Sequence, residues 1–169
     1  MSSLFRSLYV VLLIGAFAGA AIGAAPEVRS FTAKSFAEIK QAHAGRAFII
    51  ALWSVTCEPC REEMMLVADL HKKYPKVPII LVAADPPSSR AAVLRFLGNY
   101  KLGRIQIWQF NDDSAERLRY SIDKSWTGEL PRSYFLNAQH EVTAQSGVVD
   151  PQWLKNWVER ETAAARVQR

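Results

Sequence analysis

The two cysteines of the chain, Cys57 and Cys60, lie three residues apart at the junction of two contrasting segments. Segment 47–53, before the pair, is apolar and rich in β-branched and aromatic residues, which is typical of a buried strand. Segment 61–74, after it, has the pattern of an amphipathic helix. This junction places the first sulfur at a helix N-terminus, where unpaired amide groups and the helix dipole stabilise a thiolate. A thiolate is the form of cysteine that attacks a disulfide.

A closely spaced cysteine pair has two other common uses, a zinc site and a structural disulfide. A structural zinc site needs two further ligands, whereas the three histidines, His43, His71 and His140, are scattered along the chain. A structural disulfide is the second alternative, although such a short loop constrains the unfolded chain only a little. The spacing therefore favours a redox-active dithiol, and no metal or cofactor is expected.

Residues 1–25 have the composition of a targeting segment. Arg6 is their only charged residue, and an apolar run from Leu8 to Ala21 leads into small residues before Pro26. This order is typical of a secretory signal peptide. An uncleaved membrane anchor is the alternative, because the apolar run lies near the lower limit of about 17–25 residues for a bilayer span. Either interpretation places the rest of the chain outside the cytoplasm, which in a bacterium means the periplasm.

The remaining length of about 145 residues suits one domain with its own core. We expect this domain to occupy residues 29–162, with a polar tail over 163–169. The net charge of +5 comes from basic residues interspersed with acids. Without a basic stripe that carries interleaved aromatics, nucleic acid is not an expected partner.

The apolar patterns predict an α/β domain in which early strands alternate with helices and a hairpin and a helix close the chain. Such alternation implies a sheet that begins parallel, with helices on both faces, and the final hairpin makes the central sheet mixed. The expected strands cover 47–53, 77–84, 104–110, 130–136 and 141–148, and the expected helices cover 35–43, 60–74, 89–99, 112–120 and a last segment from about 150.

These residues resemble the thioredoxin fold, and more narrowly the TlpA-like thiol-disulfide oxidoreductases that include the ResA and DsbE types of cytochrome c maturation. The resemblance covers about residues 29–160. It rests on the pair Cys57-Glu58-Pro59-Cys60 with Glu63 three residues further on, on Pro131 at the start of a late strand, and on the secretory leader.

The resemblance implies a substrate-binding edge beside the dithiol. The Leu130–Pro131 bond is expected to be cis, with the backbone of Leu130 available to pair with an extended peptide. The family often has tryptophan directly before its first cysteine; here Thr56 stands there, and Trp53 keeps an aromatic three residues earlier. Trp53 is therefore included among the expected substrate contacts. The loops 85–89 and 121–129 would shape the groove, with Trp126 either exposed or packed as a loop anchor.

The resemblance also assigns chemical roles. Cys57 is the attacking nucleophile, Cys60 is the more buried resolving thiol, and the two form a disulfide when oxidised. Pro59 shapes the helix start. Glu58 places a negative charge beside the thiolate and disfavours it, a tuning effect that favours a reductant. Glu63 lies on the same helical face as Cys60 and either accepts its proton or is a solvated surface residue.

The expected function is that of an extracytoplasmic protein-disulfide reductase. Its partners would be a protein disulfide, such as that of an apocytochrome c or a metal-site assembly protein, and a membrane thiol-disulfide carrier that supplies electrons. Three alternatives remain open from the residues: an oxidase that donates disulfides, a peroxidase, and a Cu(I)-binding chaperone that uses the same thiolates.

Overall fold

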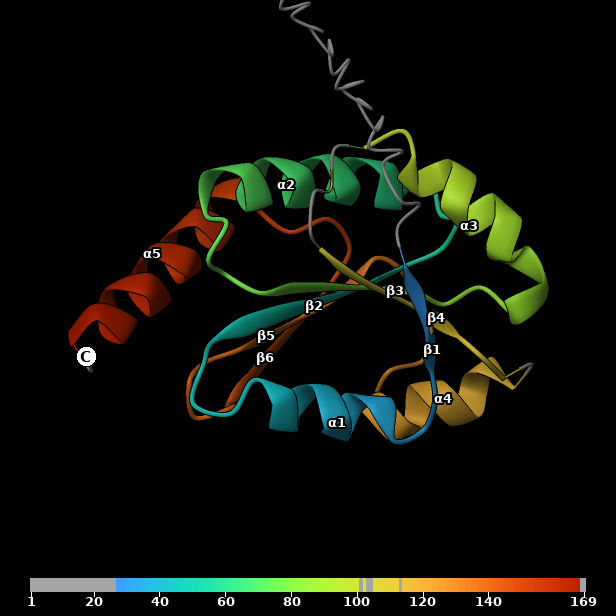
Figure 1. Cartoon of the computed structure of the whole chain (residues 1–169), viewed down its shortest axis with the longest axis horizontal. Helices are drawn as coiled ribbons and strands as arrows, with labels where there is room; N and C mark the ends of the chain where they lie inside the picture. Colours follow the sequence, from blue (N-terminus) through green and yellow to red (C-terminus); the bar gives the residue numbers. More distant parts are fainter. Residues whose placement is uncertain (1–26, 101, 103–104, 113, 168–169) are drawn as a thin grey trace, which may run out of the picture.

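The computed structural model describes residues 27–100, 102, 105–112 and 114–167 (Figure 1). The expected leader, 1–25, lies outside these residues. Within them, no helix combines the length and the apolar character needed to cross a bilayer.

A six-stranded mixed sheet in the order β1-β4-β3-β2-β5-β6 forms the centre of the domain. The first four strands in this order are parallel, and β5 and β6 are antiparallel to their neighbours. The alternation in the sequence predicted both features, and the expected α/β domain with a mixed central sheet is confirmed. The strands are β1 (Val28–Phe31), β2 (Phe48–Trp53), β3 (Ile79–Ala83), β4 (Gln106–Phe110), β5 (Arg132–Leu136) and β6 (Val142–Ser146).

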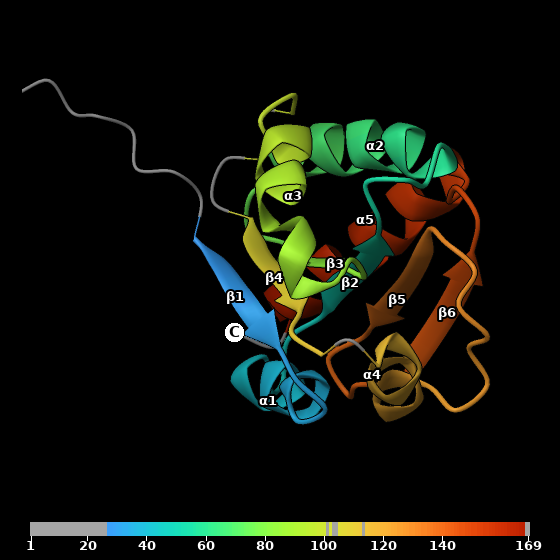
Figure 2. The ribbon, with the colours of Figure 1, turned by 90° about the vertical axis from the view of Figure 1, so that its right-hand side faces the viewer.

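The helices cover both faces of the sheet (Figures 1 and 2). One face is covered by α2 (Pro59–Lys73), α3 (Arg90–Leu97) and α5 (Pro151–Val167), and the other by α1 (Ser35–Ala42) and α4 (Ala115–Ile122). A short 3-10 turn, η1 (Pro87–Ser89), leads into α3. All six residues of β2 are buried, and they alternate between the two resulting cores. The position of β2 between two helical layers explains why segment 47–53 is continuously apolar.

Three details differ from the sequence-based expectation. The edge strand β1 was not expected, because it has four residues and only its first and last are buried. Helix α4 begins at Ala115 rather than near residue 112. The expected polar tail, 163–169, is helical as far as Val167, since three consecutive alanines from Ala163 are strong helix formers and extend α5.

Burial on both faces of β3 should make this strand sensitive to truncation. Leu81 is fully buried between β2 and β4, so Leu81→Ala should lower the free energy of unfolding by about 2–5 kcal/mol. Val142→Ala is the control, because Val142 is 48% exposed on the edge strand β6 and should cost less than about 1 kcal/mol. Urea unfolding of the oxidised proteins measures both values, and equal losses would contradict this description of the core.

Candidate active site at the Cys57–Cys60 disulfide

The two cysteines form a disulfide between the end of β2 and the first turn of α2, with a Cα–Cα distance of 5.3 Å. Pro59 is the first residue of α2, where its missing amide proton removes no helical hydrogen bond. The backbone amide of Cys60 donates to Cys57 Sγ at 3.2 Å. An amide N–H at a helix start that donates to this sulfur stabilises the thiolate form of Cys57 when the disulfide is reduced.

The two sulfurs have different environments. Cys60 is fully buried in the core beneath α2, whereas Cys57 is only partly buried. Glu58 is exposed at the rim, where its carboxylate accepts a hydrogen bond from Arg61 Nε at 3.1 Å. Cys57 is therefore the more accessible of the two sulfurs.

Glu63 is a buried residue of α2 that is 5% exposed, not a solvated helix residue. Its Oε1 accepts from the Ser133 hydroxyl at 2.9 Å, and its Oε2 accepts from the Val149 amide at 3.0 Å. Burial raises the pKa of Glu63 above its ordinary value of 4.5, although both hydrogen bonds oppose that shift. Of the two interpretations left open by the sequence, this burial excludes the solvated surface residue.

The Leu130–Pro131 peptide bond is cis, as the resemblance implied. Pro131 is buried and directly precedes β5, which pairs with β2, the strand that leads to Cys57. The loop before it is fastened by Trp126, which is 5% exposed and donates its indole N–H to the Glu129 carbonyl at 2.9 Å. Trp126 is therefore a packed loop anchor rather than an exposed substrate contact.

Arg132, the residue after Pro131, ties the same loop to the sheet. Its guanidinium donates to Asp123 Oδ2 at 2.9 Å and to the Ser146 hydroxyl at 2.6 Å. Ser146 in turn donates to Glu129, and this hydrogen bond leads the contacts that hold the pKa of Glu129 at about 2. Sequence analysis missed this network; the available signal was one charged residue, Arg132, at the start of a strand that is otherwise uncharged.

Trp53 is placed differently from what a substrate-binding residue requires. Its side chain is 1% exposed and stacks on Phe96 with ring centroids 4.6 Å apart. Position 53 is the last residue of a strand buried on both faces, so its side chain points into the core beneath α3. Trp53 therefore supports the site from below and is corrected from a substrate contact to a core residue.

Sequence analysis also missed Asp85. This residue follows β3, is 5% exposed, and accepts hydrogen bonds from the segment directly before Cys57. The available signal was an acid just beyond a buried strand, because the carboxyl ends of neighbouring parallel strands meet at one edge. Among the described residues, no group of three or more histidine, cysteine, aspartate or glutamate side chains is arranged to hold a metal ion.

The burial of Glu63 predicts a pH-dependent effect on stability. Because folding raises its pKa, the folded state binds more protons than the unfolded state above pH 4.5, and stability falls as pH rises through this range. Glu63→Gln keeps groups that can bond Ser133 and Val149 but does not ionise. The variant should therefore gain stability relative to the wild type at pH 7 compared with pH 4, in denaturant titrations at both values. Glu38→Gln, on the exposed surface of α1, is the control. A Glu63→Gln effect that is the same at the two pH values would contradict the shift.

Comparisons with known proteins agree with this geometry. No protein-family model matches the chain. Thiol-disulfide oxidoreductase ResA of Bacillus thuringiensis (strain Al Hakam) is 25% identical over 101 residues, which cover 60% of this chain and 54% of that protein. The ResA protein of Oceanobacillus iheyensis is 24% identical over 98 residues, which cover 58% and 47%. The chain thus spans about half the length of these curated relatives.

Solved structures show the same fold at lower sequence identity. A DsbE-type thiol:disulfide interchange protein from Chlorobium tepidum has a TM-score of 0.58 and 16% identity, with 72% of this chain and 83% of that chain covered. StoA from Bacillus subtilis has a TM-score of 0.52 and 21% identity, with 68% and 84% covered. The solved structures show that the chain has the thioredoxin fold, and its sequence, with the Cys57–Cys60 pair, is similar to thiol-disulfide oxidoreductases of the ResA type.

Proposed function

We propose that the protein is an extracytoplasmic thiol-disulfide oxidoreductase that reduces disulfides in other proteins. The observation that carries the proposal is the asymmetry of the dithiol: Cys57 is partly buried at the start of α2, and Cys60 is fully buried behind it. An accessible thiol that attacks and an enclosed thiol that resolves are what exchange through a mixed disulfide requires.

The cycle starts from the reduced dithiol. The Cys57 thiolate attacks one sulfur of the partner disulfide, and the other partner sulfur leaves as a thiolate that takes a proton from water. Cys60 then loses its proton and attacks Cys57 Sγ, which releases the second partner thiolate. The product is the Cys57–Cys60 disulfide, so two electrons pass from this dithiol to the partner.

Glu63 is the group that we assign to the proton of Cys60. The two residues are one helical turn apart on the buried side of α2, where water is excluded. A carboxyl whose pKa is raised by burial is a better proton acceptor near neutral pH than an exposed glutamate. The hydrogen bonds from Ser133 and Val149 fix the carboxyl, so the proton transfer needs no large rearrangement.

The substrate edge would be the backbone at Leu130, immediately before the cis bond to Pro131. An extended peptide that pairs with this backbone would bring its own disulfide beside Cys57. The anchored loop 123–129 supports this surface from behind, through Trp126 and Arg132. The proposed substrate class is therefore a disulfide in an extended segment of a protein, such as an apocytochrome c or a metal-site assembly protein.

The proposed location outside the cytoplasm rests on the apolar composition of residues 1–25. A similar solved structure is described as a secreted Mycobacterium tuberculosis disulfide oxidoreductase homologous to E. coli DsbE. A reductase in an oxidising compartment needs a continuous source of electrons. A membrane thiol-disulfide carrier is the proposed donor, with residues 1–25 as an export signal or an anchor.

Mutational trapping tests the two cysteine roles. Cys60→Ser should accumulate a mixed disulfide through Cys57, because the resolving thiol is absent and the intermediate cannot be released. Cys57→Ser should trap at least about tenfold less, since Cys60 is enclosed. Non-reducing gel electrophoresis after incubation with a disulfide-containing protein measures both adducts. Equal trapping by the two variants would contradict the assignment.

The direction of electron flow is tested by the reduction potential of the Cys57–Cys60 couple. We expect a value near roughly −270 mV or below, as for a reductant of the thioredoxin kind, in equilibration with defined thiol buffers. Glu38→Gln, on the exposed surface of α1, serves as the control and should leave the potential unchanged. A wild-type value near roughly −120 mV would instead indicate a disulfide donor, and the reductase proposal would be withdrawn.

A further inference from the structure

The segment between β2 and Cys57 is held by one buried carboxylate, Asp85, from the loop that follows β3. Asp85 Oδ1 accepts from the Ser54 hydroxyl at 2.9 Å and from the Val55 amide at 3.3 Å, and Oδ2 lies 3.2 Å from the same amide. Asp85 is 5% exposed. A buried carboxylate with these bonds to one short segment fixes that segment far better than an exposed side chain would.

The Ser54 hydroxyl links Asp85 to the backbone next to Cys57. It accepts from the Thr56 amide at 3.3 Å while it donates to Asp85, and the Cys57 amide donates to the Ser54 carbonyl at 3.2 Å. Residues 54–56 are thus closed into a tight turn with Asp85 on its inner side. The position of Cys57 relative to the Cys60 amide, which donates to its sulfur, depends on that turn.

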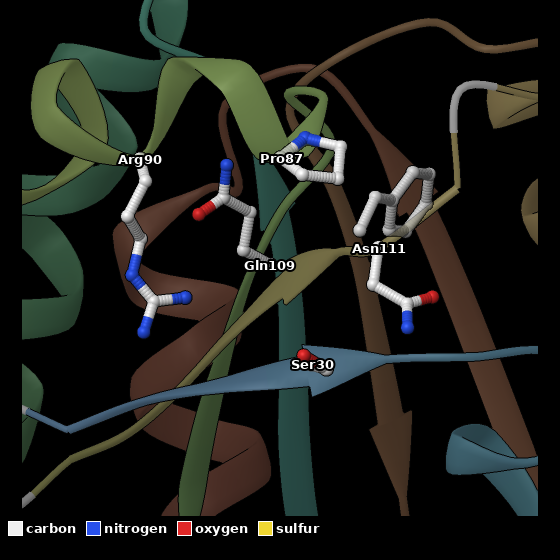
Figure 3. Close-up of a pocket in the computed structure, with 6 residues that line it drawn as sticks. Ser30, Pro87, Arg90, Gln109 and Asn111 are labelled. Carbon is white, nitrogen blue, oxygen red and sulfur yellow. The ribbon is translucent and has the colours of Figure 1, made fainter.

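Asp85 is itself held from the opposite side. Gln109 of β4 is 2% exposed, and its Nε2 donates to the Pro86 carbonyl at 2.7 Å. Figure 3 shows the Gln109 side chain between Arg90 and Pro87. This amide lies beside a small cavity of about 70 Å³ on that side of the sheet. Gln109 of β4 therefore holds the backbone after β3, and Asp85 in that backbone holds the turn at residues 54–56.

We propose that Asp85 is a positioning residue for Cys57: by holding the turn 54–56, it keeps the Cys57 sulfur within reach of the Cys60 amide. The proposal rests on the assigned role of Cys57 as the attacking thiol. It assigns Asp85 a mechanical effect through its acceptor oxygens, distinct from the electrostatic effect of its negative charge, which would disfavour a neighbouring thiolate.

Two substitutions separate these effects. Asp85→Asn and Asp85→Ala lose the same carboxylate, but the asparagine Oδ1 can accept both bonds that Asp85 Oδ1 accepts from Ser54 and Val55. Alanine accepts neither. A difference between the two variants therefore reports the hydrogen bonds alone.

The experiment uses the full chain with Cys60→Ser, so that Cys57 is the one remaining thiol. Its alkylation rate by iodoacetamide is measured from pH 4 to 9, and the midpoint of the profile reports the thiolate. We expect Asp85→Ala to react about threefold or more slowly than Asp85→Asn at pH values below the midpoint, with a correspondingly higher midpoint. Identical profiles for the two folded variants would overturn the proposal.

Asn137→Ala is the matched structural control. Asn137 Oδ1 accepts two backbone amides in the β5–β6 turn, at the end of the sheet opposite Cys57, and its loss should leave the alkylation profile unchanged. A shift in this control equal to that of Asp85→Ala would also overturn the proposal. If Asp85→Ala fails to fold, Ser54→Ala removes one of the same bonds and should slow alkylation below the midpoint; an unchanged profile would count against the proposal.

Failure of the proposed function would look different. In that case the single-thiol parents Cys60→Ser and Cys57→Ser would be alkylated equally fast, whatever residue stands at position 85. If only the present inference fails, the Cys60→Ser and Cys57→Ser proteins are still alkylated at different rates, but Asp85→Ala and Asp85→Asn are alkylated at the same rate.

Discussion

The buried carboxyl of Glu63 joins the three parts of the chain that must meet at the dithiol. Its side chain projects from α2, which carries Cys60 in its first turn, and accepts hydrogen bonds from Ser133 of β5 and from the Val149 amide before α5. A carboxyl in this position costs several kcal/mol if a partner is lost, because water cannot replace the missing hydrogen bond. The helix, the strand that follows the cis-proline, and the final connection are therefore held in register by one side chain.

A second buried carboxylate, Asp85, holds the segment that precedes Cys57 by accepting hydrogen bonds from Ser54 and Val55. Glu63 fixes α2 after the cysteines, and Asp85 fixes the turn before them. Glu63 bonds to β5 and Asp85 follows β3, and these two strands are the neighbours of β2 in the sheet. The segments on both sides of the cysteine pair are thus held by hydrogen bonds to buried acids. Cys57 can move little without breaking one of these hydrogen bonds.

Much of this arrangement was readable from the sequence because it rests on local patterns. The continuous apolar run of β2, the cysteine spacing and the alternation of later elements each predict one feature, and the cis bond at Pro131 followed from the resemblance. What the sequence did not reveal are contacts between residues far apart in the chain. Asp85 and Ser54 are separated by 31 positions, and Glu63 and Val149 by 86. Trp53 was misassigned for the same reason, since the Phe96 ring that covers it comes from a helix much later in the chain.

The charges at the rim of the site act more weakly than the sequence suggested. Glu58 was expected to disfavour the thiolate of Cys57, but its side chain is 84% exposed and paired with Arg61. Solvent and salt screen such a charge, and an exposed ion pair of this kind contributes at most about 1 kcal/mol. Asp85 and Glu63 are shielded from water, and their hydrogen bonds reach the backbone on either side of the dithiol. The redox properties of this dithiol should therefore depend more on these two buried acids than on the exposed charge of Glu58.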